Sequence, residues 1–306
     1  MADLSRVVFG TMRMTSWGAN LDADGATALL AAARDHGLTS IDCADIYGHY
    51  TVEALLGEAF KKDASLKETL RVVTKTSIKL PCDLRPEFPV KAYDTSRSHV
   101  EASVAASKAA LGLDQLPLLL LHRPDHLTSS REAAASLRRL VEKGDVARVG
   151  VSNYNLAQLA ALRTALEDEG GDVRLCVNQI EASIVKPLPL LDGTADAMVT
   201  EHKGLTVQAW SPLAGGALFD PAHADGARIV AAIEKMQKVS VDFSGLDVST
   251  VALAWLMRHS ANIAPVVGTT KVERIAEAAR ARDIADKMSG DQWYKLMEAA
   301  IGREID

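Results

Sequence analysis

The stretch Ser40-Ile-Asp-Cys-Ala-Asp-Ile-Tyr-Gly-His49 starts with the pattern of a buried strand and ends as a polar loop. Asp42 stands at the strand end, and Tyr47 follows in the loop. A carboxylate buried at such a position without a partner would cost several kcal/mol. Asp42 is therefore expected to face a cation. The next apolar run, Arg71-Val-Val-Thr-Lys-Thr76, supplies one in Lys75.

A third apolar run, Leu116-Pro-Leu-Leu-Leu-Leu121, ends in His122. Three consecutive strands are thus expected to end in Asp42, Lys75 and His122, with Tyr47 in the loop between the first two. If the strands are parallel neighbours, these ends meet at one edge of the sheet.

Short β-rich runs alternate with helical patterns along the chain, which is typical of βα units around a parallel sheet. We expect strands over residues 6–11, 38–43, 71–76, 116–121, 147–152, 174–179, 204–209 and 263–267. We expect helices over residues 24–36, 51–61, 96–111, 128–143, 155–166, 190–203, 227–238, 249–259, 271–281 and 289–301. This pattern favours an α/β fold, a (β/α)8 TIM barrel that forms a single domain over residues 1–306.

The alternative architecture is an open, doubly wound sheet. Such a sheet usually carries a G-x-G-x-x-G nucleotide site after its first strand. The chain reads Gly10-Thr-Met-Arg-Met14 at that point, so the barrel is favoured.

Composition excludes several classes of partner. The net charge of -6 argues against nucleic acid and anionic membranes. The chain has no apolar run near the ~20 residues of a membrane helix, and its first residues do not form a signal-peptide pattern. Cys43, Cys82 and Cys176 are odd in number and unclustered, as reduced thiols of a cytoplasmic protein would be. We expect a cytoplasmic monomer or weak homo-oligomer.

The four polar residues suit the reduction of a carbonyl group. A nearby ammonium, Lys75, is expected to lower the pKa of Tyr47, while Asp42 keeps Lys75 charged. His122 would hydrogen-bond a substrate oxygen, and Tyr47 would supply a proton to the developing alkoxide. Each residue alone has a structural explanation, as an ion pair, a loop aromatic or an interior histidine. Three of them at consecutive strand ends, with Tyr47 in the loop between the first two, favour catalysis.

Two other chemistries are open to the same residues. His122, Asp125 and His126 have spacings that a metal could use, but the first strand offers no His-x-His pair, and we expect no metal. Lys75 could form a Schiff base, but such a lysine acts as a neutral amine, and Asp42 would keep it charged.

Four motifs resemble the aldo-keto reductase superfamily, in its bacterial oxidoreductase branch, and they occur in that family's order. They are Asp42-x-Ala-x-x-Tyr47-Gly48, Lys75, Leu121-His122-Arg-Pro-Asp125 and Gly150-Val-Ser-Asn153. The resemblance extends from Gly10-Thr11 to Arg274. It implies a (β/α)8 barrel that transfers a hydride between NADP(H), less often NAD(H), and a carbonyl or alcohol. It also implies Tyr47 as general acid, Asp42 and Lys75 as its tuning pair, and His122 as the group that orients the carbonyl.

The same resemblance implies the cofactor site. Ser152, Asn153 and Gln179 would hydrogen-bond the nicotinamide carboxamide, and Trp210 would stack on its ring. The loop with Ser211, Pro212, Leu213, Gly215 and Gly216 would pass over the pyrophosphate. The expected site also includes the first-strand residues Gly10, Thr11 and Met12.

The start of the helix after the eighth strand would bind the 2′-phosphate of NADPH through its free amides and dipole. The expected contacts there are Gly268, Thr269, Thr270, Lys271 and Arg274, with Glu277 facing the adenine. Gly268 replaces a lysine found in many members, and Ala278 replaces an asparagine. NADH therefore stays possible as the cofactor.

The sequence thus predicts an NADPH-dependent oxidoreductase that reduces small-molecule aldehydes or ketones by direct hydride transfer. The alternative is a nucleotide-sensing regulatory subunit of the same fold with little turnover. Substrate choice is expected to lie in three mouth loops, residues 13–20 with Trp17, the Pro-rich segment 77–95, and residues 183–189.

Overall fold

The barrel is built from eight parallel strands. The structure is a computed structural model that describes residues 4–168, 170 and 172–305. The strands are β1 (Val8–Gly10), β2 (Ser40–Asp42), β3 (Arg71–Thr76), β6 (Leu118–Leu121), β7 (Val149–Ser152), β8 (Leu175–Glu181), β9 (Thr206–Trp210) and β10 (Ala264–Val267). They close in the order β1-β10-β9-β8-β7-β6-β3-β2. The predicted (β/α)8 fold is confirmed.

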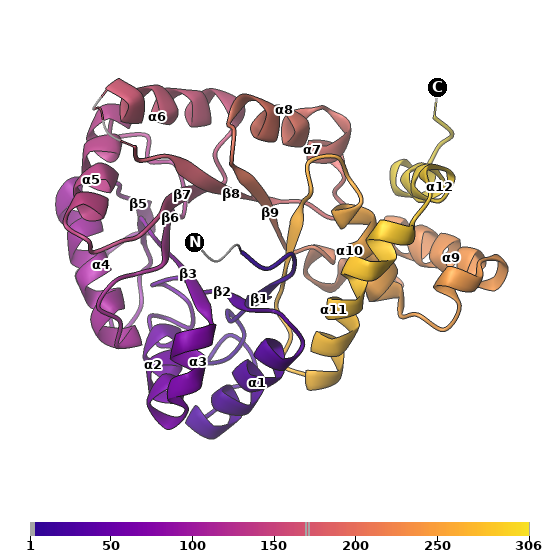
Figure 1. Cartoon of the computed structure of the whole chain (residues 1–306), viewed down its shortest axis with the longest axis horizontal. Coiled ribbons are helices and arrows are strands. Elements are labelled where there is room, and N and C mark those ends of the chain that lie inside the picture. Colours follow the sequence, from indigo (N-terminus) through magenta and orange to yellow (C-terminus); the bar gives the residue numbers. More distant parts are fainter. Residues whose placement is uncertain (1–3, 169, 171, 306) are drawn as a thin grey trace.

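Helices surround the strands on the outside (Figure 1). They are α1 (Ala23–Asp35), α2 (Val52–Lys62), α3 (Ala64–Thr69), α4 (Arg97–Leu111), α5 (Ser130–Glu142), α6 (Leu156–Asp168), α7 (Leu188–Leu191), α8 (Thr194–Glu201), α9 (Ala224–Val239), α10 (Val248–Met257), α11 (Val272–Lys287) and α12 (Gly290–Ile301). Two 3-10 turns, η1 (Ala214–Phe219) and η2 (Val241–Phe243), complete the elements. Across the described part of the chain, no helix has the length and apolarity that a membrane crossing requires.

The end of the barrel opposite the carboxyl ends of the strands is filled by apolar side chains. Val73, Leu118, Leu120 and Val177 form a buried cluster inside the strands, and Leu4 packs against it. Figure 1 shows the described residues that precede β1 within the ring of strands. These residues thereby help to close this end of the barrel, and the cavity lies at the other end.

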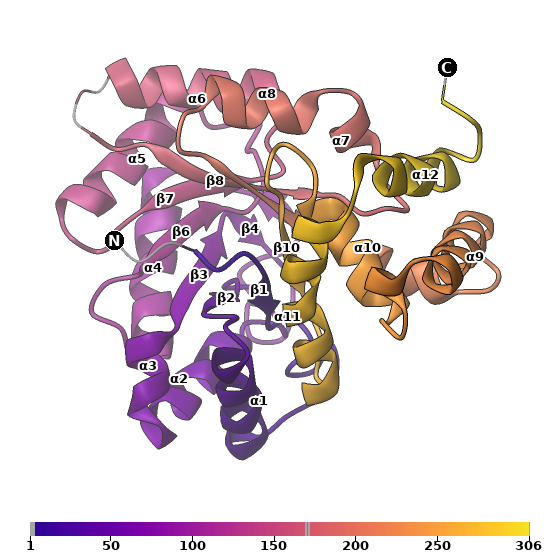
Figure 2. The same cartoon turned by 45° about the vertical axis from the view of Figure 1, so that its right-hand side comes forward.

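The C-terminal helix α12 is fixed to the barrel wall by a tryptophan pair. Trp255 of α10 and Trp293 of α12 stack with their ring centroids 5.0 Å apart. Each indole N–H donates to the backbone carbonyl of the other residue, at 3.1 and 3.0 Å. Ser289 and Gln292 form a capping box at the start of α12. Figure 2 shows α12 beside α9, on the outside of the barrel.

Two local expectations were wrong, and one short helix was not predicted. The helix expected over 190–203 is two helices, α7 and α8, separated at Gly193, which has a φ of 81° that a helix does not tolerate. The segment 77–95 is not simply a loop, because β4 (Ile78–Lys79) and β5 (Ala92–Tyr93) pair as a two-stranded antiparallel sheet. The short helix α3 follows α2 with no interruption beyond Asp63, whose side chain caps it.

Candidate active site

The carboxyl ends of the strands open into a cavity of about 880 Å³. Asp42 ends β2, Lys75 lies near the end of β3, and His122 follows β6 directly. The parallel register sets these elements side by side, because Asp42 lies opposite Val73 and Lys75 lies opposite Leu120. Tyr47 comes from the loop after β2, and all four predicted catalytic residues meet at the barrel mouth.

Lys75 lies at the centre of this cluster and is fully buried. Its Nζ atom is 2.7 Å from Asp42 Oδ1, and it donates to the Cys43 carbonyl at 2.8 Å and to the Tyr47 hydroxyl at 2.9 Å. A lysine with three acceptors, one of them a carboxylate, is bound as an ammonium. This geometry suits an ion pair and does not suit the neutral amine that a Schiff base requires.

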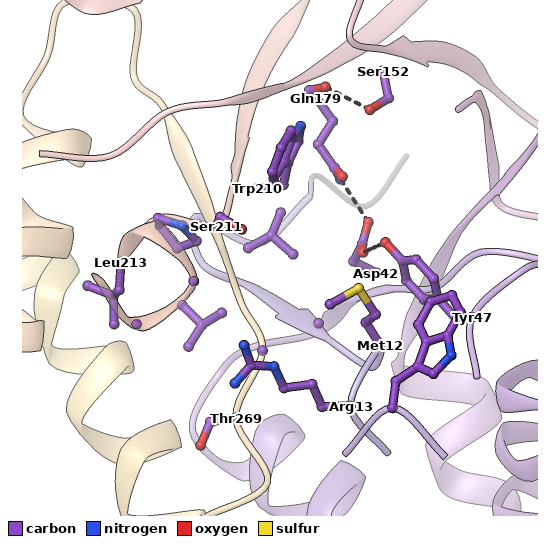
Figure 3. Close-up of a pocket in the computed structure, with 18 of the residues that line it drawn as sticks. Met12, Arg13, Asp42, Tyr47, Ser152, Gln179, Trp210, Ser211, Leu213 and Thr269 are labelled. Atoms are coloured by element: carbon purple, nitrogen blue, oxygen red, sulfur yellow. Dashed lines mark hydrogen bonds between the residues drawn. The ribbon is translucent and has the colours of Figure 1, made fainter. Parts of the chain in front are cut away.

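The Tyr47 hydroxyl donates to Asp42 Oδ2 at 3.3 Å, as Figure 3 shows. The expected lowering of its pKa is wrong for the protein alone. Burial, the largest cause, and the negative charge of Asp42 raise the pKa of Tyr47 well above its usual value. Removing the phenolic proton would leave a phenolate beside that carboxylate with little water to solvate it. Tyr47 is therefore a fully protonated donor at neutral pH.

His122 lies beside Tyr47, with their ring centroids 6.0 Å apart and their planes at 77°. Burial lowers the pKa of His122 well below its usual value, and the positive charges of Lys75, Arg123 and Lys91 lower it further. Its Nδ1 atom is buried and has no hydrogen-bond partner among the described residues. The imidazole is therefore neutral and can offer one N–H to a substrate oxygen.

A chain of hydrogen bonds joins the predicted nicotinamide contacts to Asp42. Gln179 Nε2 donates to Asp42 Oδ1 at 2.7 Å, and the Ser152 hydroxyl donates to the Gln179 carbonyl at 2.8 Å (Figure 3). Asn153 Nδ2 donates to the His122 carbonyl at 3.1 Å, and Trp210 Nε1 donates to Asn153 Oδ1 at 2.9 Å. The predicted catalytic and nicotinamide residues thus form one connected network.

The cavity continues from Trp210 along the loop after β9 to the start of α11. Gly215 and Gly216 have φ angles of 66° and 110°, which an L-residue rarely adopts. A Cβ added at either glycine would meet nothing within 4 Å, so their backbone faces open space. The opposite wall contains Gly268, Thr269 and Arg274.

Most of the predicted cofactor residues line the cavity. They are Gly10, Met12, Ser152, Asn153, Gln179, Trp210, Ser211, Pro212, Leu213, Gly215, Gly216, Gly268, Thr269, Arg274 and Glu277. Thr11, Thr270 and Lys271 are not among the lining residues. Thr11 has another role, because its hydroxyl donates to the Asp42 carbonyl at 2.8 Å and so positions the strand end. The Lys271 amide donates to Thr269 Oγ1 at 3.2 Å.

Sequence reasoning missed three cations that line the cavity, Arg13, Lys91 and Arg123. Arg13 was assigned only to a mouth loop, yet Figure 3 shows it extending into the cavity between Tyr47 and Leu213. Single cations in loops follow no periodic pattern, so the only signal along the chain was the Arg within the His122 motif.

Asp125, one of the residues considered for a metal, has other partners. Asp125 Oδ2 accepts hydrogen bonds from the Thr95 amide at 2.9 Å and from the Thr128 hydroxyl at 2.6 Å. Within the described ranges, no three His, Cys, Asp or Glu side chains come together as metal ligands would.

Comparisons with known proteins agree with this geometry. Residues 6–301 match the Aldo/keto reductase family. The chain is 38% identical to a 6-dehydroglucose reductase of Agrobacterium fabrum, over 99% of this chain and 96% of the relative. It is 34% identical to the oxidoreductase YdhF of Escherichia coli, over 99% and 96% of the two chains.

Solved structures share the fold. An aldo/keto reductase from Klebsiella pneumoniae in complex with NADP and acetate matches with a TM-score of 0.75 and 24% identity, over 95% of this chain and 89% of that one. The thermostable aldo-keto reductase Tm1743 matches with a TM-score of 0.77 and 22% identity, over 96% and 94% of the two chains. At this identity the likeness shows the fold alone. The match along the sequence shows more: this chain is an NAD(P)H-dependent oxidoreductase and belongs to the aldo/keto reductase family.

Proposed function

We propose that the chain reduces aldehydes and ketones to alcohols, with NADPH as the hydride donor and Tyr47 as the general acid. One observation carries the proposal. The Tyr47 hydroxyl lies 2.9 Å from the buried Lys75 ammonium, next to His122, at the wall of a cavity long enough to include both Trp210 and Arg274. A proton donor, a hydrogen-bond donor and an extended cofactor groove thus share one cavity.

The residues present fit a reduced dinucleotide phosphate. Trp210 presents a flat ring near the catalytic cluster, and Gly215 and Gly216 present backbone to open space as a phosphate-binding loop requires. Arg13 and Arg274 line the cavity and form no ion pair with another described residue, so both can neutralise phosphate charge. The aldo/keto reductase from Klebsiella pneumoniae, which shares this fold, was solved in complex with NADP.

The residues act in a definite order on a bound carbonyl. His122 donates a hydrogen bond to the carbonyl oxygen and orients it towards Tyr47. When bound in this cavity, NADPH would supply the hydride for the carbonyl carbon. As the oxygen becomes an alkoxide, a far stronger base than a phenolate, it takes the Tyr47 proton even though the pKa of Tyr47 is raised. Lys75 then stabilises the phenolate until the proton is replaced.

The test is the variant Tyr47→Phe, which removes the proton and retains the ring. We expect kcat to fall by about 10²–10⁴-fold, the usual contribution of a general acid, while the Kd of NADPH changes by less than about threefold, since no ion pair is lost. Tyr50→Phe is the matched control, because the Tyr50 hydroxyl bonds to the Leu80 amide at 2.9 Å and lies outside the cavity lining. Unchanged turnover in Tyr47→Phe would contradict the proposal that Tyr47 is the general acid.

The substrate panel should include 6-dehydroglucose, because the Agrobacterium fabrum relative is a 6-dehydroglucose reductase. The competing function is a nucleotide sensor with little turnover. Oxidation of bound NADPH in a single turnover separates the two. Rapid loss of nucleotide fluorescence with an aldehyde indicates an enzyme, and persistent fluorescence across the panel indicates a sensor.

A further inference from the structure

Two cations on the substrate side of the cavity have no counter-charge. Lys91 and Arg123 both line the cavity, and neither forms an ion pair with any residue that the structure describes. Lys75, the third cation near His122, is neutralised by Asp42 at 2.7 Å. A net positive charge therefore remains on the wall of the substrate space.

The carboxylates of the neighbouring loops, Asp94 and Asp125, have other partners. Asp94 pairs with Lys79 and accepts the Ser96 amide at 2.9 Å. Asp125 accepts the Leu127 amide at 2.8 Å, in addition to its bonds to the Thr95 amide and the Thr128 hydroxyl. Both carboxylates stabilise loop backbone, and neither forms an ion pair with Lys91 or Arg123 among the described residues.

Ordered backbone presents both cations. The Ser77 hydroxyl donates to the Arg123 carbonyl at 3.1 Å and accepts from the Arg123 amide at 3.2 Å. Lys91 directly precedes β5, which is paired with β4 through Ile78–Tyr93 and Lys79–Ala92. The two charges are therefore held by the small β4–β5 sheet and its contact with the loop after β6.

Both charges lie at the reacting end of the cavity. Lys91 and Arg123 each act electrostatically on His122, and the Arg123 guanidinium carbon is 5.9 Å from the centre of the Trp210 ring. The segments proposed for the cofactor phosphates, Gly215–Gly216 and Gly268–Arg274, come from the loops after β9 and β10 instead. The uncompensated charge thus faces the substrate rather than the phosphates.

We propose that the preferred substrate is an aldehyde or ketone that carries an anionic oxyacid group, such as a carboxylate, bound by Lys91 and Arg123. This inference rests on the proposed function. Trp17, Ile46, Ile78 and Leu80 also line the cavity and would provide apolar contact for the carbon skeleton of the substrate. Charge-assisted hydrogen bonds to a partly desolvated anion are stronger than bonds to a neutral group of the same shape.

The experiment compares 4-carboxybenzaldehyde with 4-carbamoylbenzaldehyde, and the 3-substituted pair in parallel. Each pair differs in charge but hardly in shape. We expect kcat/KM to be at least tenfold higher for the carboxylate in one pair, and the ratio to shrink between 50 and 500 mM NaCl because salt screens the attraction. Equal kcat/KM within both pairs would overturn the inference and leave the proposed reductase function intact.

The double variant Lys91→Met/Arg123→Gln should bring the carboxylate-to-amide ratio of kcat/KM close to one. Lys295→Met, an exposed cation on α12, is the matched control and should keep the ratio of the unmodified protein. A preference that persists in the double variant would assign it to other residues and refute the proposal.

A binding measurement separates this inference from the proposed chemistry. Calorimetric titration of the NADP⁺ complex with 4-(hydroxymethyl)benzoate and 4-(hydroxymethyl)benzamide, and with their 3-isomers, needs no turnover. Tighter binding of a benzoate, lost in the double variant, supports the anion site even if no aldehyde is reduced. Equal binding within both pairs counts against it even if every aldehyde is reduced.

Discussion

Asp42 organises the proposed catalytic cluster through both its side chain and its backbone. Its Oδ1 atom lies 2.7 Å from both Lys75 Nζ and Gln179 Nε2, and its Oδ2 atom accepts from Tyr47. Its carbonyl accepts from the Thr11 hydroxyl at 2.8 Å. Only 2% of Asp42 is exposed, so each contact acts in a medium of low dielectric constant. Removing one of these partners therefore also changes the contacts of Asp42 with the others.

Lys75 is expected to have separable roles in stability and catalysis. Lys75→Met leaves Asp42 buried without its cation, and should lower the free energy of unfolding by about 3–5 kcal/mol. The double variant Lys75→Met/Asp42→Asn removes the stranded charge and should recover most of that loss, but it should not recover turnover. Urea denaturation and kcat, measured on the same samples, check both parts. If the double variant regains turnover, the ion pair contributes to stability and not to catalysis.

The pH dependence of reduction should reflect the raised pKa of Tyr47 and the lowered pKa of His122. Because the pKa of His122 lies below the usual value of a histidine and the pKa of Tyr47 above that of a tyrosine, the imidazole is neutral and the phenol protonated between pH 6.5 and 9. We therefore expect kcat for aldehyde reduction to vary by less than about threefold between pH 6.5 and 9, since neither group changes protonation there. Alcohol oxidation needs the phenolate, and its rate should rise throughout this range. A tenfold fall in reduction per pH unit above 7.5 would show an acidic phenol instead.

At the scale of elements, the barrel followed from the sequence because strands buried on both faces read as short apolar runs between amphipathic helices. β6, with four consecutive buried leucines, is the clearest case. The β4–β5 sheet was missed because strands of two residues show no periodicity. The break at Gly193 was missed because one glycine within a helical pattern is often tolerated.

The catalytic cluster was predictable for the same physical reason, since polar residues at the ends of buried strands stand out. The pKa values of the residues within it were not predictable. The pKa of Tyr47 depends on desolvation and on a 3.3 Å contact with Asp42, and neither follows from spacing along the chain. The bond between Asp42 and Gln179 joins residues that are 137 positions apart. Barrel closure, and not local sequence, creates it.

The loop after β9 should affect cofactor affinity more than chemistry. Gly216→Ala forces a Cβ onto a backbone with a φ of 110° and should raise the Kd of NADPH about tenfold, equivalent to about 1.4 kcal/mol of backbone strain. The kcat at saturating NADPH should change little. Gly290→Ala is the control, because Gly290 begins α12 and a Cβ there meets nothing within 4 Å. Fluorescence titration measures the Kd, and an unchanged value for Gly216→Ala would contradict the assigned role of the loop.

On the scale of the whole molecule, packing and chemistry occupy opposite ends of the barrel. The apolar cluster of Val73, Leu118, Leu120 and Val177, against which Leu4 packs, and the contacts between helices stabilise the fold. The mouth, by contrast, contains charged groups whose burial is unfavourable.

Two further carboxylates lie near the mouth, outside the proposed mechanism. Glu53 is 6% exposed and accepts a hydrogen bond from the Thr74 hydroxyl at 2.5 Å, and the Asp45 amide donates to the Lys75 carbonyl at 3.0 Å.

Asp45 is expected to make the protein less stable in alkaline solution. Burial first, and the nearby Glu53 second, raise the pKa of Asp45 from 3.8 to about 8. Between these pH values the folded protein holds a proton that the unfolded chain has released, so stability falls as pH rises from about 4 to about 8. The two pH units from pH 6 to pH 8 correspond to about 2.7 kcal/mol at the full shift, and because Asp45 is only partly buried by surface area we expect about 2 kcal/mol over this interval. Asp45→Asn cannot ionise, and its Tm relative to the unmodified protein should rise by about 3 °C between pH 6 and pH 9. Asp83→Asn, on an exposed loop, should show no such trend. Thermal unfolding across this pH range decides the matter, since parallel Tm curves for the Asp45→Asn variant and the unmodified protein would show that Asp45 ionises freely in the folded state.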